Sequence, residues 1–378
     1  MIRASEAERR RLHHDFARLC AVASPSGSER ACAELVVREL GRLGLEVDED
    51  DAGRPTGGDC GNLLARVPGD GDRAILLCTH LDTVPPSGPI EPVLVDGGWE
   101  NAGEGILGAD NKAAVAVALA LARRLAADPA DVTLELLFTV SEEDALAGAK
   151  AFDAGRLWSS FGYTFDHASA IGEIVTASPT YYRLGAEFRG LAAHAGIRPE
   201  AGRSAVLAAA RAVATMRLGR LDDETTANVG VFEGGSAANV VPGRCRVVGE
   251  ARSTDPVRAE QAVTDMVDRL GDAANTADCE CDLDVTVERL FDGYRTPRGA
   301  RQIRVAQEAL RDCGYEPRLI STGGGSDANA LLAQGFACAN LANGTERNHQ
   351  PDERVSAAAL EGMLDVGLAI VRRAAEAG

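Results

Sequence analysis

Basic residues, and lysine above all, are scarce in this 378-residue chain. Lys112 and Lys150 are the only lysines, the other basic residues are arginines, and the formal net charge is −18. Nucleic acids and anionic membrane surfaces attract proteins through a basic face. The acidic balance therefore argues against both kinds of partner, whereas metal cations and small substrates are compatible with it.

Two further absences concern the cellular compartment. The nine cysteines are scattered and include no Cys-x-x-Cys pair, which is typical of reduced thiols in the cytoplasm. The N-terminal residues lack the apolar segment of a secretory signal, and the longest apolar run, at 113–122, is too short to span a bilayer. We expect a cytoplasmic protein without a membrane-spanning segment.

The chain is long enough for two folding units, and its first part alternates between helix-like and strand-like segments. The patterns predict helices at 5–22, at 29–43 with Ser28 as N-cap, and at 110–127. Apolar runs predict strands at 61–67, 74–79, 132–140 and 161–165. This alternation favours an α/β fold with a mainly parallel mixed sheet flanked by helices.

Residues 178–291 follow a different pattern. Their predicted order is β-α-β-β-α-β, which is the ferredoxin-like arrangement of a compact α+β unit. The α/β alternation then resumes to the end of the chain. We therefore expect one discontinuous α/β domain, formed by 1–177 and 292–378, that carries an inserted ferredoxin-like lid at 178–291.

Side chains able to bind a metal follow three of the predicted strands. In chain order they are His80 and Asp82, then Glu142 and Glu143, then Asp166. Each group alone is a weak signal, because polar residues at strand ends and in solvated turns are common. In parallel sheets, however, ligands gather outside the carboxyl ends of the strands. The sequence therefore indicates a site at this edge, where Asp82 can orient the imidazole of His80.

Asp110 lies where a glycine-bearing loop meets the long alanine-rich helix. Aspartate is favoured at a helix N-terminus because free backbone N–H groups and the helix dipole stabilise it, and taken alone this explains the residue. The alternative is a rigidly held ligand that bridges two metals. His349, which follows the last predicted strand, would complete such a set.

Together these motifs resemble the M20 family of dizinc metallopeptidases, and most closely its tripeptide aminopeptidase (peptidase T) branch. The matching residues are His80-Leu81-Asp82, the stretch from Gly105 to Lys112, Ser141-Glu142-Glu143, Asp166, Ala193-His194-Ala195-Gly196 and His349. They cover nearly the whole chain in order and spacing. The family's fold, an α/β catalytic domain interrupted by a ferredoxin-like lid, is similar to the organisation predicted above.

The resemblance implies a dinuclear zinc centre. Its ligands would be His80 and Asp166 for one Zn²⁺ and Glu143 and His349 for the other, with Asp110 bridging the two. Asp82 would orient His80, and Glu142 would be the general base for the water between the metals. Two divalent ions lower the pKa of bound water and polarise the scissile carbonyl. We expect two Zn²⁺ per chain, although Mn²⁺ or Co²⁺ can occupy such a site.

The resemblance also implies substrate contacts by His194, Asn239, Arg252, Gly324 and Gly325. In related enzymes the histidine that matches His194 stabilises an oxyanion, often across a dimer, so a homodimer through the lid is an expectation. A lone histidine in a loop is more often structural. Arg252 can bind a peptide carboxylate with its planar fork, or it can pair with Glu250, and the sequence leaves both open.

Aspartate rather than glutamate at position 166 resembles the aminopeptidase and dipeptidase members and favours peptidase chemistry. Ala114 and Gln350 depart from the family's usual glycine and threonine, but both are outside the ligand set. Our hypothesis is an exopeptidase, an aminopeptidase on short peptides. The alternatives are an N-acyl-amino-acid amidohydrolase or a carboxypeptidase of the same family, and a non-catalytic metal or peptide binder. The presence of Glu142 argues against the non-catalytic binder.

Overall fold

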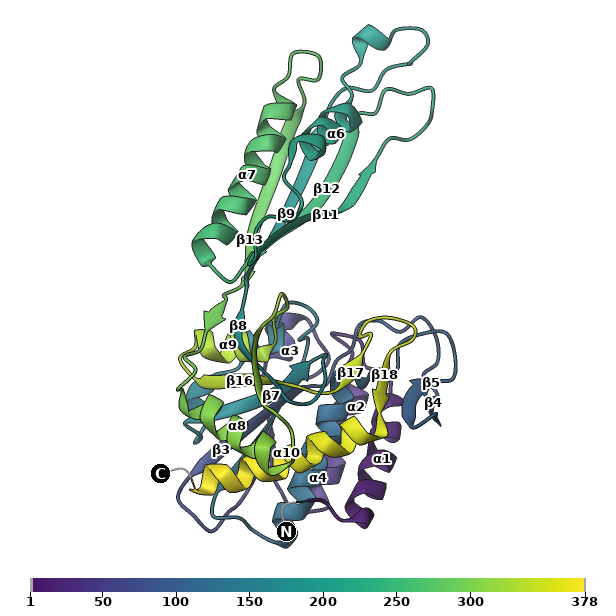
Figure 1. Ribbon diagram of the computed structural model, residues 1–378. Coiled ribbons are helices and arrows are strands. Elements are labelled where there is room, and N and C mark those ends of the chain that lie inside the picture. The colour runs from purple at the N-terminus through teal and green to yellow at the C-terminus, as the bar shows by residue number, and fades with distance from the viewer. Residues whose placement is uncertain (1–2, 377–378) are drawn as a thin grey trace. The chain divides into compact units, whose positions relative to one another are not determined.

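A computed structural model describes residues 3–376 of the chain (Figure 1). The chain divides into two compact units. Unit 1 comprises Met1–Thr176, Thr296–Ser321 and Gly325–Gly378, and unit 2 comprises Ala177–Arg295 and Thr322–Gly324. Across residues 3–376, no helix is both long enough and apolar enough to cross a membrane.

A nine-stranded sheet forms the centre of unit 1, in the order β1-β2-β6-β3-β7-β16-β8-β14, with β15 also paired to β8. The strands are β1 (Val47–Glu49), β2 (Leu63–Val67), β3 (Ala74–His80), β6 (Thr133–Thr139), β7 (Phe161–His167), β8 (Glu173–Ser178), β14 (Tyr294–Arg295), β15 (Arg318–Ser321) and β16 (Ala337–Ala342). The central strands β6, β3, β7 and β16 are parallel, and β2 and β8 flank them antiparallel. The predicted mixed, mainly parallel sheet is confirmed.

Helices cover both faces of this sheet. One face carries α1 (Glu6–Cys20), α2 (Arg30–Gly41), α4 (Ala109–Ala127), α8 (Arg301–Asp312) and α10 (Ala357–Glu376). The other carries α9 (Asp327–Ala333), with α5 (Ala147–Ala151) and α3 (Gly53–Thr56) beside it. Alternate residues of β3 reflect this division, because Ile75 and Leu77 lie in the core with α4 whereas Leu76 and Cys78 lie in a second cluster with Leu331.

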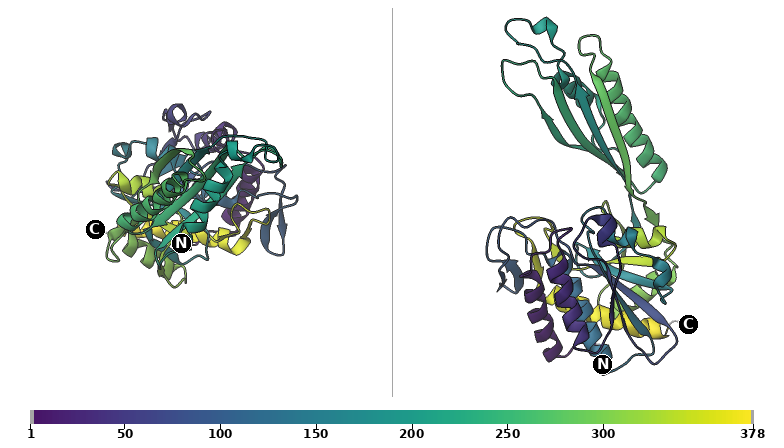
Figure 2. Two further views of the ribbon diagram at one scale, coloured as in Figure 1. Left: turned by 90° about the horizontal axis from the view of Figure 1, so that it is seen from above. Right: turned by 180° about the vertical axis from the view of Figure 1, so that it is seen from behind.

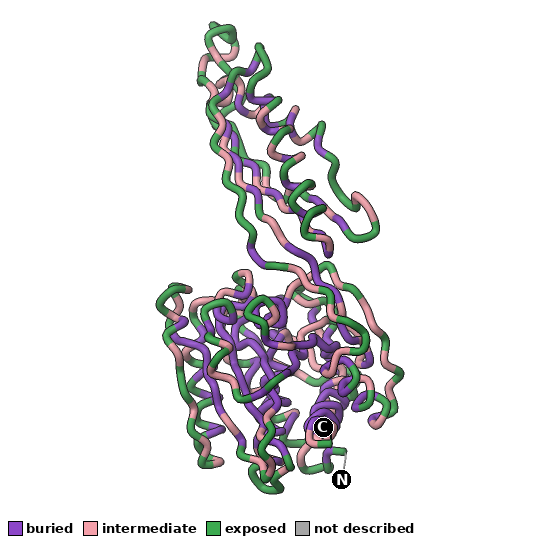
Figure 3. The backbone as a smooth tube through the Cα atoms, turned by 90° about the vertical axis from the view of Figure 1, so that its left-hand side faces the viewer, coloured by how far each residue is buried: buried purple, intermediate pink, exposed green. Residues whose placement is uncertain are grey.

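Helix α4 lies in the interior of unit 1. Every residue from Asn111 to Ala122 is buried, and Figure 3 shows the buried backbone concentrated in the middle of this unit. The small alanine side chains allow the helix to approach the sheet closely, and close-packed interiors leave little room for movement. The N-terminal end of α4 is therefore held firmly in place.

A small antiparallel sheet, in the order β17-β18-β5-β4, lies beside the main one in unit 1. Its strands are β4 (Pro92–Val95), β5 (Gly98–Asn101), β17 (Thr345–Glu346) and β18 (Arg354–Ser356). The segment 347–353, which contains His349, connects β17 to its partner β18. Pairing of β18 with β5 thus fixes both ends of this segment.

Unit 2 is a five-stranded antiparallel sheet, in the order β10-β11-β12-β9-β13, with two helices on one face. Its elements are β9 (Thr180–Arg189), α6 (Ala205–Thr215), β10 (Gly219–Arg220), β11 (Thr225–Gly234), β12 (Arg244–Ser253), α7 (Pro256–Ala274) and β13 (Asp282–Phe291). Apart from the short β10, this is the predicted β-α-β-β-α-β order. Helix α7 runs alongside β13 in the right-hand view of Figure 2.

The structure differs from the sequence patterns at the start of α2 and in the shortest strands. Ser28 is not the N-cap of α2, so that prediction was wrong. Glu29 occupies the cap position and makes no side-chain cap hydrogen bond. Five strands of two or three residues were not predicted, because so few residues carry too little periodicity to be recognised; they are β1, β10, β14, β17 and β18. The six-residue strand β8 was also missed.

Candidate functional site

The strand ends of the main sheet bring the predicted metal ligands of unit 1 together. Strands β3 and β6 are parallel and in register, with His80 opposite Thr139. Strand β7 pairs with the other side of β3, with Thr164 opposite Cys78. His80, Glu142 and Asp166 therefore reach the same edge, and one ligand atom from each lies within 4.8 Å of the others.

His80 is buried between two carboxylates. Its Nε2 lies 3.4 Å from Oδ1 of Asp110 and 3.6 Å from Oδ1 of Asp166. Its Nδ1 lies 3.0 Å from the backbone carbonyl oxygen of Asp82, and a proton donated there leaves the Nε2 lone pair facing the carboxylates. Nε2 has no hydrogen-bond partner although it is fully buried. A buried imidazole nitrogen that faces carboxylates and has no hydrogen-bond partner is suited to binding a divalent cation.

His349 forms the opposite side of the site. Its Nε2 lies 2.7 Å from Oε1 of Glu143 and 3.5 Å from Oδ2 of Asp110. The two oxygens of Asp110 therefore face different histidines, since Oδ1 faces His80 and Oδ2 faces His349. The role of Asp110 as a bridge between two metals stays a prediction.

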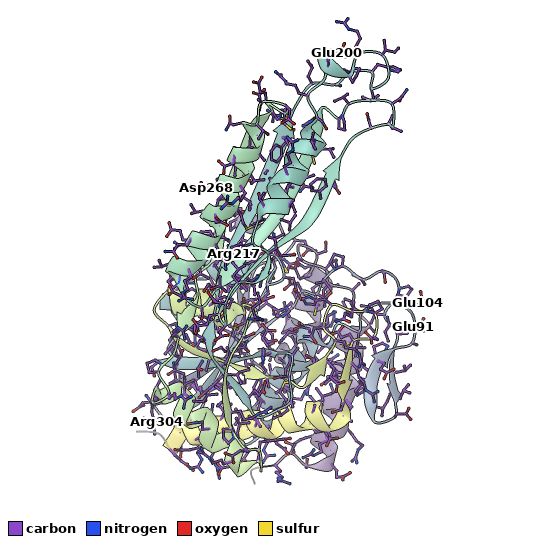
Figure 4. All side chains as sticks on the ribbon, turned by 45° about the horizontal axis from the view of Figure 1, so that its top comes forward. Glu91, Glu104, Glu200, Arg217, Asp268 and Arg304 are labelled. Atoms are coloured by element: carbon purple, nitrogen blue, oxygen red, sulfur yellow. The ribbon has the colours of Figure 1, made fainter. Side chains whose placement is uncertain are left out.

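Asp110 begins α4 without capping it. The chain passes from Glu104, at the exposed edge of unit 1 in Figure 4, to buried Ala109 within five residues. Asp110 has extended backbone angles, with φ −82° and ψ 106°, inside the helix boundaries. Its carboxylate accepts hydrogen bonds from Nδ2 of Asn348 at 2.7 Å and of Asn111 at 3.4 Å, and it faces the two histidines.

The crowded charges of the site shift several pKa values. Burial, followed by the Asp110 carboxylate, raises the pKa of Asp166 to about 8. Burial and Asp166 also raise the pKa of Glu142 well above its usual value. Asp110 and Glu143 raise the pKa of His349 to about 10. Metal ligands must be deprotonated, so bound cations would take the place of these protons.

Asp82 does more than the sequence predicted. Its carboxylate is fully buried and lies 3.3 Å from Nδ1 of His80. The same carboxylate accepts the backbone N–H groups of Glu142 and Glu143, each at 3.0 Å, and the hydroxyl of Ser26 at 2.7 Å. Asp82 thus connects a histidine from β3 to the turn that carries the two glutamates.

Two buried glutamates that the sequence did not indicate accept backbone N–H groups of the loops around the site. Glu29 accepts from Gly27 at 2.8 Å and from Ser141 at 3.0 Å. Glu353 accepts from three residues of the loop that carries Asp110, and burial is the main reason why its pKa is raised to about 7. Neither glutamate stands in a pattern of spacing that marks it as an acceptor.

Two buried residues beside Asp110 also contribute. The Nδ2 of Asn111 donates to Oδ1 of Asp166 at 3.0 Å and to the carbonyl oxygen of Phe165 at 2.8 Å. Lys112 donates from Nζ to the carbonyl oxygen of Val22. Asn111 therefore positions a predicted ligand, while Lys112 ties the start of α4 to the segment after α1.

His194 and Asn239 meet at one end of unit 2. His194 follows β9, Asn239 precedes β12, and the N–H of Ala195 donates to the carbonyl oxygen of Asn239 at 2.9 Å. Both residues are exposed. This end is remote from the residues, near 177 and 295, where the chain enters and leaves unit 2.

Arg252 lies at the other end of the same sheet. Its guanidinium pairs with Glu250 at 3.0 Å, lies 3.9 Å from the ring centroid of Tyr181, and donates to the carbonyl oxygen of Gly323 at 3.2 Å. The ion pair that was one alternative is thus present, and binding of a substrate carboxylate stays a prediction. The carbonyl oxygen of Gly324 accepts from Ser178 at 2.8 Å, while Gly325 belongs to unit 1.

Comparison with known proteins places the chain among hydrolases. The sequence model of peptidase family M20/M25/M40 matches residues 76–376. The chain is 35% identical to the uncharacterized protein YqjE of Bacillus subtilis over 369 residues, which are 97% of this chain and 99% of that protein. It is similar to the crystal structure of aminopeptidase PepT from Bacillus cereus, with a TM-score of 0.86 and 37% identity over 97% of this chain and 99% of that one. A tripeptidase from Staphylococcus aureus has a TM-score of 0.91 and 32% identity over the same shares.

Proposed function

The chain belongs to peptidase family M20/M25/M40, and from this premise we propose that it is a dizinc aminopeptidase that acts on short peptides. The observation that carries the proposal is Asp110, whose two carboxylate oxygens face His80 on one side and His349 on the other. The similar solved structures of an aminopeptidase and a tripeptidase support the substrate class.

The residues present fit a dinuclear centre. His80 and Asp166 would hold one cation, Glu143 and His349 the other, and Asp110 both. Bound there, two divalent cations would supply Lewis acidity and lower the pKa of water. A mixed set of imidazoles and carboxylates suits Zn²⁺, and Mn²⁺ or Co²⁺ could replace it.

Glu142 is the proton carrier in this proposal. It lies beside His80 and Asp166 but outside the set proposed to hold cations. Glu142 takes a proton from the attacking water and returns it to the amine that leaves when the peptide C–N bond breaks. Asp82 keeps Glu142 in place through its backbone N–H.

Unit 2 supplies the substrate contacts in this proposal. His194 would stabilise the oxyanion, Asn239 and Gly324 would contact the peptide, and Arg252 would bind its carboxylate. Gly325, in unit 1, would line the site. His194 lies at the end of the ten-residue strands opposite to Arg252, about 30 Å away at the usual rise per residue. That separation supports a homodimer in which the lid of one copy serves the other.

A cytoplasmic location is part of the proposal. All nine cysteines are buried and unpaired, which suits a reducing compartment.

The test of the function is a panel of free tripeptides, N-acetylated tripeptides and C-amidated tripeptides, incubated with metal-replete protein. We expect cleavage of free and C-amidated peptides at the first bond and none of N-acetylated ones. Preferential cleavage of the acetyl group, or release of the C-terminal residue, would instead indicate an amidohydrolase or a carboxypeptidase.

A further inference from the structure

The carboxylate of Glu353 is enclosed by the loop that carries Asp110. Glu353 is only 2% exposed. Its Oε2 accepts the backbone N–H groups of Leu107 at 2.9 Å and of Gly108 at 2.7 Å, and its Oε1 accepts that of Asp110 at 2.9 Å. One side chain thus holds three backbone N–H groups of this loop.

These N–H groups need an acceptor from outside the helix. The first N–H groups of an α-helix have no partner within it, and a buried N–H without a partner is costly. Gly108 has a left-handed backbone with φ +74°, and Asp110 and Asn111 depart from helical angles. The loop cannot satisfy its own donors in this conformation, and a carboxylate is favoured at a helix N-terminus. Because Glu353 accepts these bonds, the carboxylate of Asp110 is left free to face the histidines.

The segment 347–353, to which Glu353 belongs, also contacts the side chain of Asp110. Between β17 and β18, Asn348 donates to Oδ2 of Asp110 at 2.7 Å, and Nε2 of His349 lies 3.5 Å from the same oxygen. Glu353 therefore fixes the backbone of Asp110, while Asn348 and His349 fix its carboxylate. The two proposed ligands Asp110 and His349 are held as one assembly.

We infer that Glu353 is a positioning residue for the metal centre, which it serves by holding the backbone at 107–110 so that Asp110 faces both histidines. This inference rests on the proposed function, because it assumes that Asp110 binds cations. Replacing a residue that orients a metal ligand typically weakens metal binding or activity about 10- to 100-fold. The effect should appear in metal affinity and in kcat, with a much smaller change in KM, because Glu353 does not touch the substrate.

The variant Glu353→Gln tests this with Glu135→Gln as its matched control. Glutamine replaces one acceptor oxygen by an NH₂ group, which cannot accept a bond from a backbone N–H. Glu135, on β6, is also fully buried and accepts backbone N–H groups, from Trp158 at 3.0 Å and Ser159 at 2.8 Å. It additionally pairs with Arg66 at 2.9 Å. Both variants should lose thermal stability without metal, but only Glu353→Gln should also lose metal affinity.

The decisive measurement is calorimetric titration of Zn²⁺ into chelator-stripped protein, together with the visible absorption of the Co²⁺-loaded protein. We expect E353Q to bind at least one of the two cations about 10- to 100-fold more weakly than wild type and to change the Co²⁺ spectrum. E135Q should keep the wild-type affinity and spectrum. Equal affinities and spectra for wild type and E353Q would overturn the inference, and so would an equal loss in E135Q.

A more conservative variant covers the case in which E353Q does not fold. Glu353→Asp keeps the charge but shortens the reach, so its Co²⁺ affinity and spectrum should differ from wild type, whereas Glu135→Asp should not. Matching spectra and affinities in E353D and wild type would overturn the inference. If the wild-type protein binds two cations and E353Q binds them equally well, only the role of Glu353 is contradicted. Wild-type protein that binds none contradicts the proposed metal centre and this inference together.

Discussion

The strand-end site of unit 1 and the loop ends of unit 2 present their residues in opposite ways. In unit 1, His80, Asp110 and Asp166 come from three separate elements, yet Nε2 of His80 lies 3.4 Å from Asp110 and 3.6 Å from Asp166 in a buried site. In unit 2, His194 and Arg252 lie at opposite ends of one sheet. His194 is exposed, and Arg252 is half-buried against Tyr181.

This difference suits the two tasks that we propose for the units. A metal centre requires ligands held within a narrow tolerance by packed elements and supporting hydrogen bonds. Asp82, Glu29 and Glu353 provide those bonds from buried positions. A substrate must arrive and leave, and surface loops on a stable sheet are suited to that. Removal of a proposed metal-bridging ligand in unit 1 should therefore abolish the chemistry, whereas substitutions of the proposed substrate contacts in unit 2 should only reduce it.

The largest effect is expected from Asp110→Ala. This change removes the carboxylate that faces both histidines, so both cations should be lost or displaced. Peptide hydrolysis should fall by more than about 10⁴-fold, beyond the loss of proton transfer alone. Metal content and the tripeptide assay check this together, with Asp268→Ala on the exposed face of α7 as a control (Figure 4). Undiminished hydrolysis by the Asp110 variant would remove the basis of the proposed function.

Glu142→Gln should be nearly as damaging but should leave metal binding intact. Glutamine has the same shape and cannot accept a proton, so kcat should fall by about 10²–10⁴-fold. The backbone N–H of Glu142, which Asp82 accepts, is unaffected by the change. A metal content of the Glu142→Gln variant equal to that of wild type would show that Glu142 carries protons and does not bind a cation. A variant that loses a cation would show that Glu142 had been assigned the wrong role.

The convergence in unit 1 was predictable because it follows from strand periodicity. Once β3, β6 and β7 are recognised as neighbouring parallel strands, His80, Glu142 and Asp166 must come to the same edge. The order of elements in unit 2 was predictable for the same reason, since its main strands and helices are long. Capping was the more probable explanation of Asp110 alone, but its carboxylate faces histidines instead.

The supporting residues were not predictable, because their partners are backbone groups far along the chain. Glu353 accepts N–H groups about 245 residues away, and neither spacing nor composition marks it. The strands β17 and β18, which hold the His349 segment, have two and three residues and show no alternation. The prediction of Ser28 as an N-cap was wrong, because Glu29 occupies that position and uses its carboxylate to hold Ser141.

In unit 2 the larger effect is expected from His194→Ala. Loss of one oxyanion donor should lower kcat about 10²–10³-fold and leave metal content unchanged. Mixing this variant with inactive Asp110→Ala protein sharpens the comparison. If the lid of one copy serves the other, mixed dimers should recover activity that neither variant has alone. No recovery despite demonstrated subunit exchange would contradict a shared site.

A smaller effect is expected from Arg252→Lys. Lysine keeps the charge but loses the planar fork that binds a carboxylate through two hydrogen bonds. KM for free tripeptides should rise about tenfold with little change in kcat, in line with the typical strength of charge-assisted hydrogen bonds. C-amidated tripeptides lack the carboxylate and serve as the control, because their KM should not respond. An equal rise for both substrates would favour a purely structural ion pair with Glu250.

The smallest effect concerns the pH dependence of stability, and it tests whether the unit 1 site is built for cations. The Asp110 and Glu143 carboxylates raise the pKa of His349 to about 10, from about 6.5 for an unperturbed histidine. A group whose pKa is raised on folding stabilises the protein fully below its unfolded pKa, and this contribution is lost as the pH rises through its folded pKa. In chelator-stripped protein, His349→Gln should therefore lower Tm by a few degrees at pH 6. The difference should narrow above pH 6.5 and close near pH 10.

Metal-loaded protein provides the contrast for this last measurement. A histidine that binds a cation has no proton to lose, so the Tm difference between wild type and His349→Gln should then persist at high pH. Thermal unfolding of both proteins from pH 6 to pH 10, with and without Zn²⁺, separates the two cases. A pH-independent difference in the stripped protein would mean that His349 does not interact with the carboxylates as the structure has it. A Tm difference that responds to both pH and metal would show that the charges around His349 are balanced either by a proton or by a cation. Substitutions of the residues proposed for unit 2 should not show this dependence.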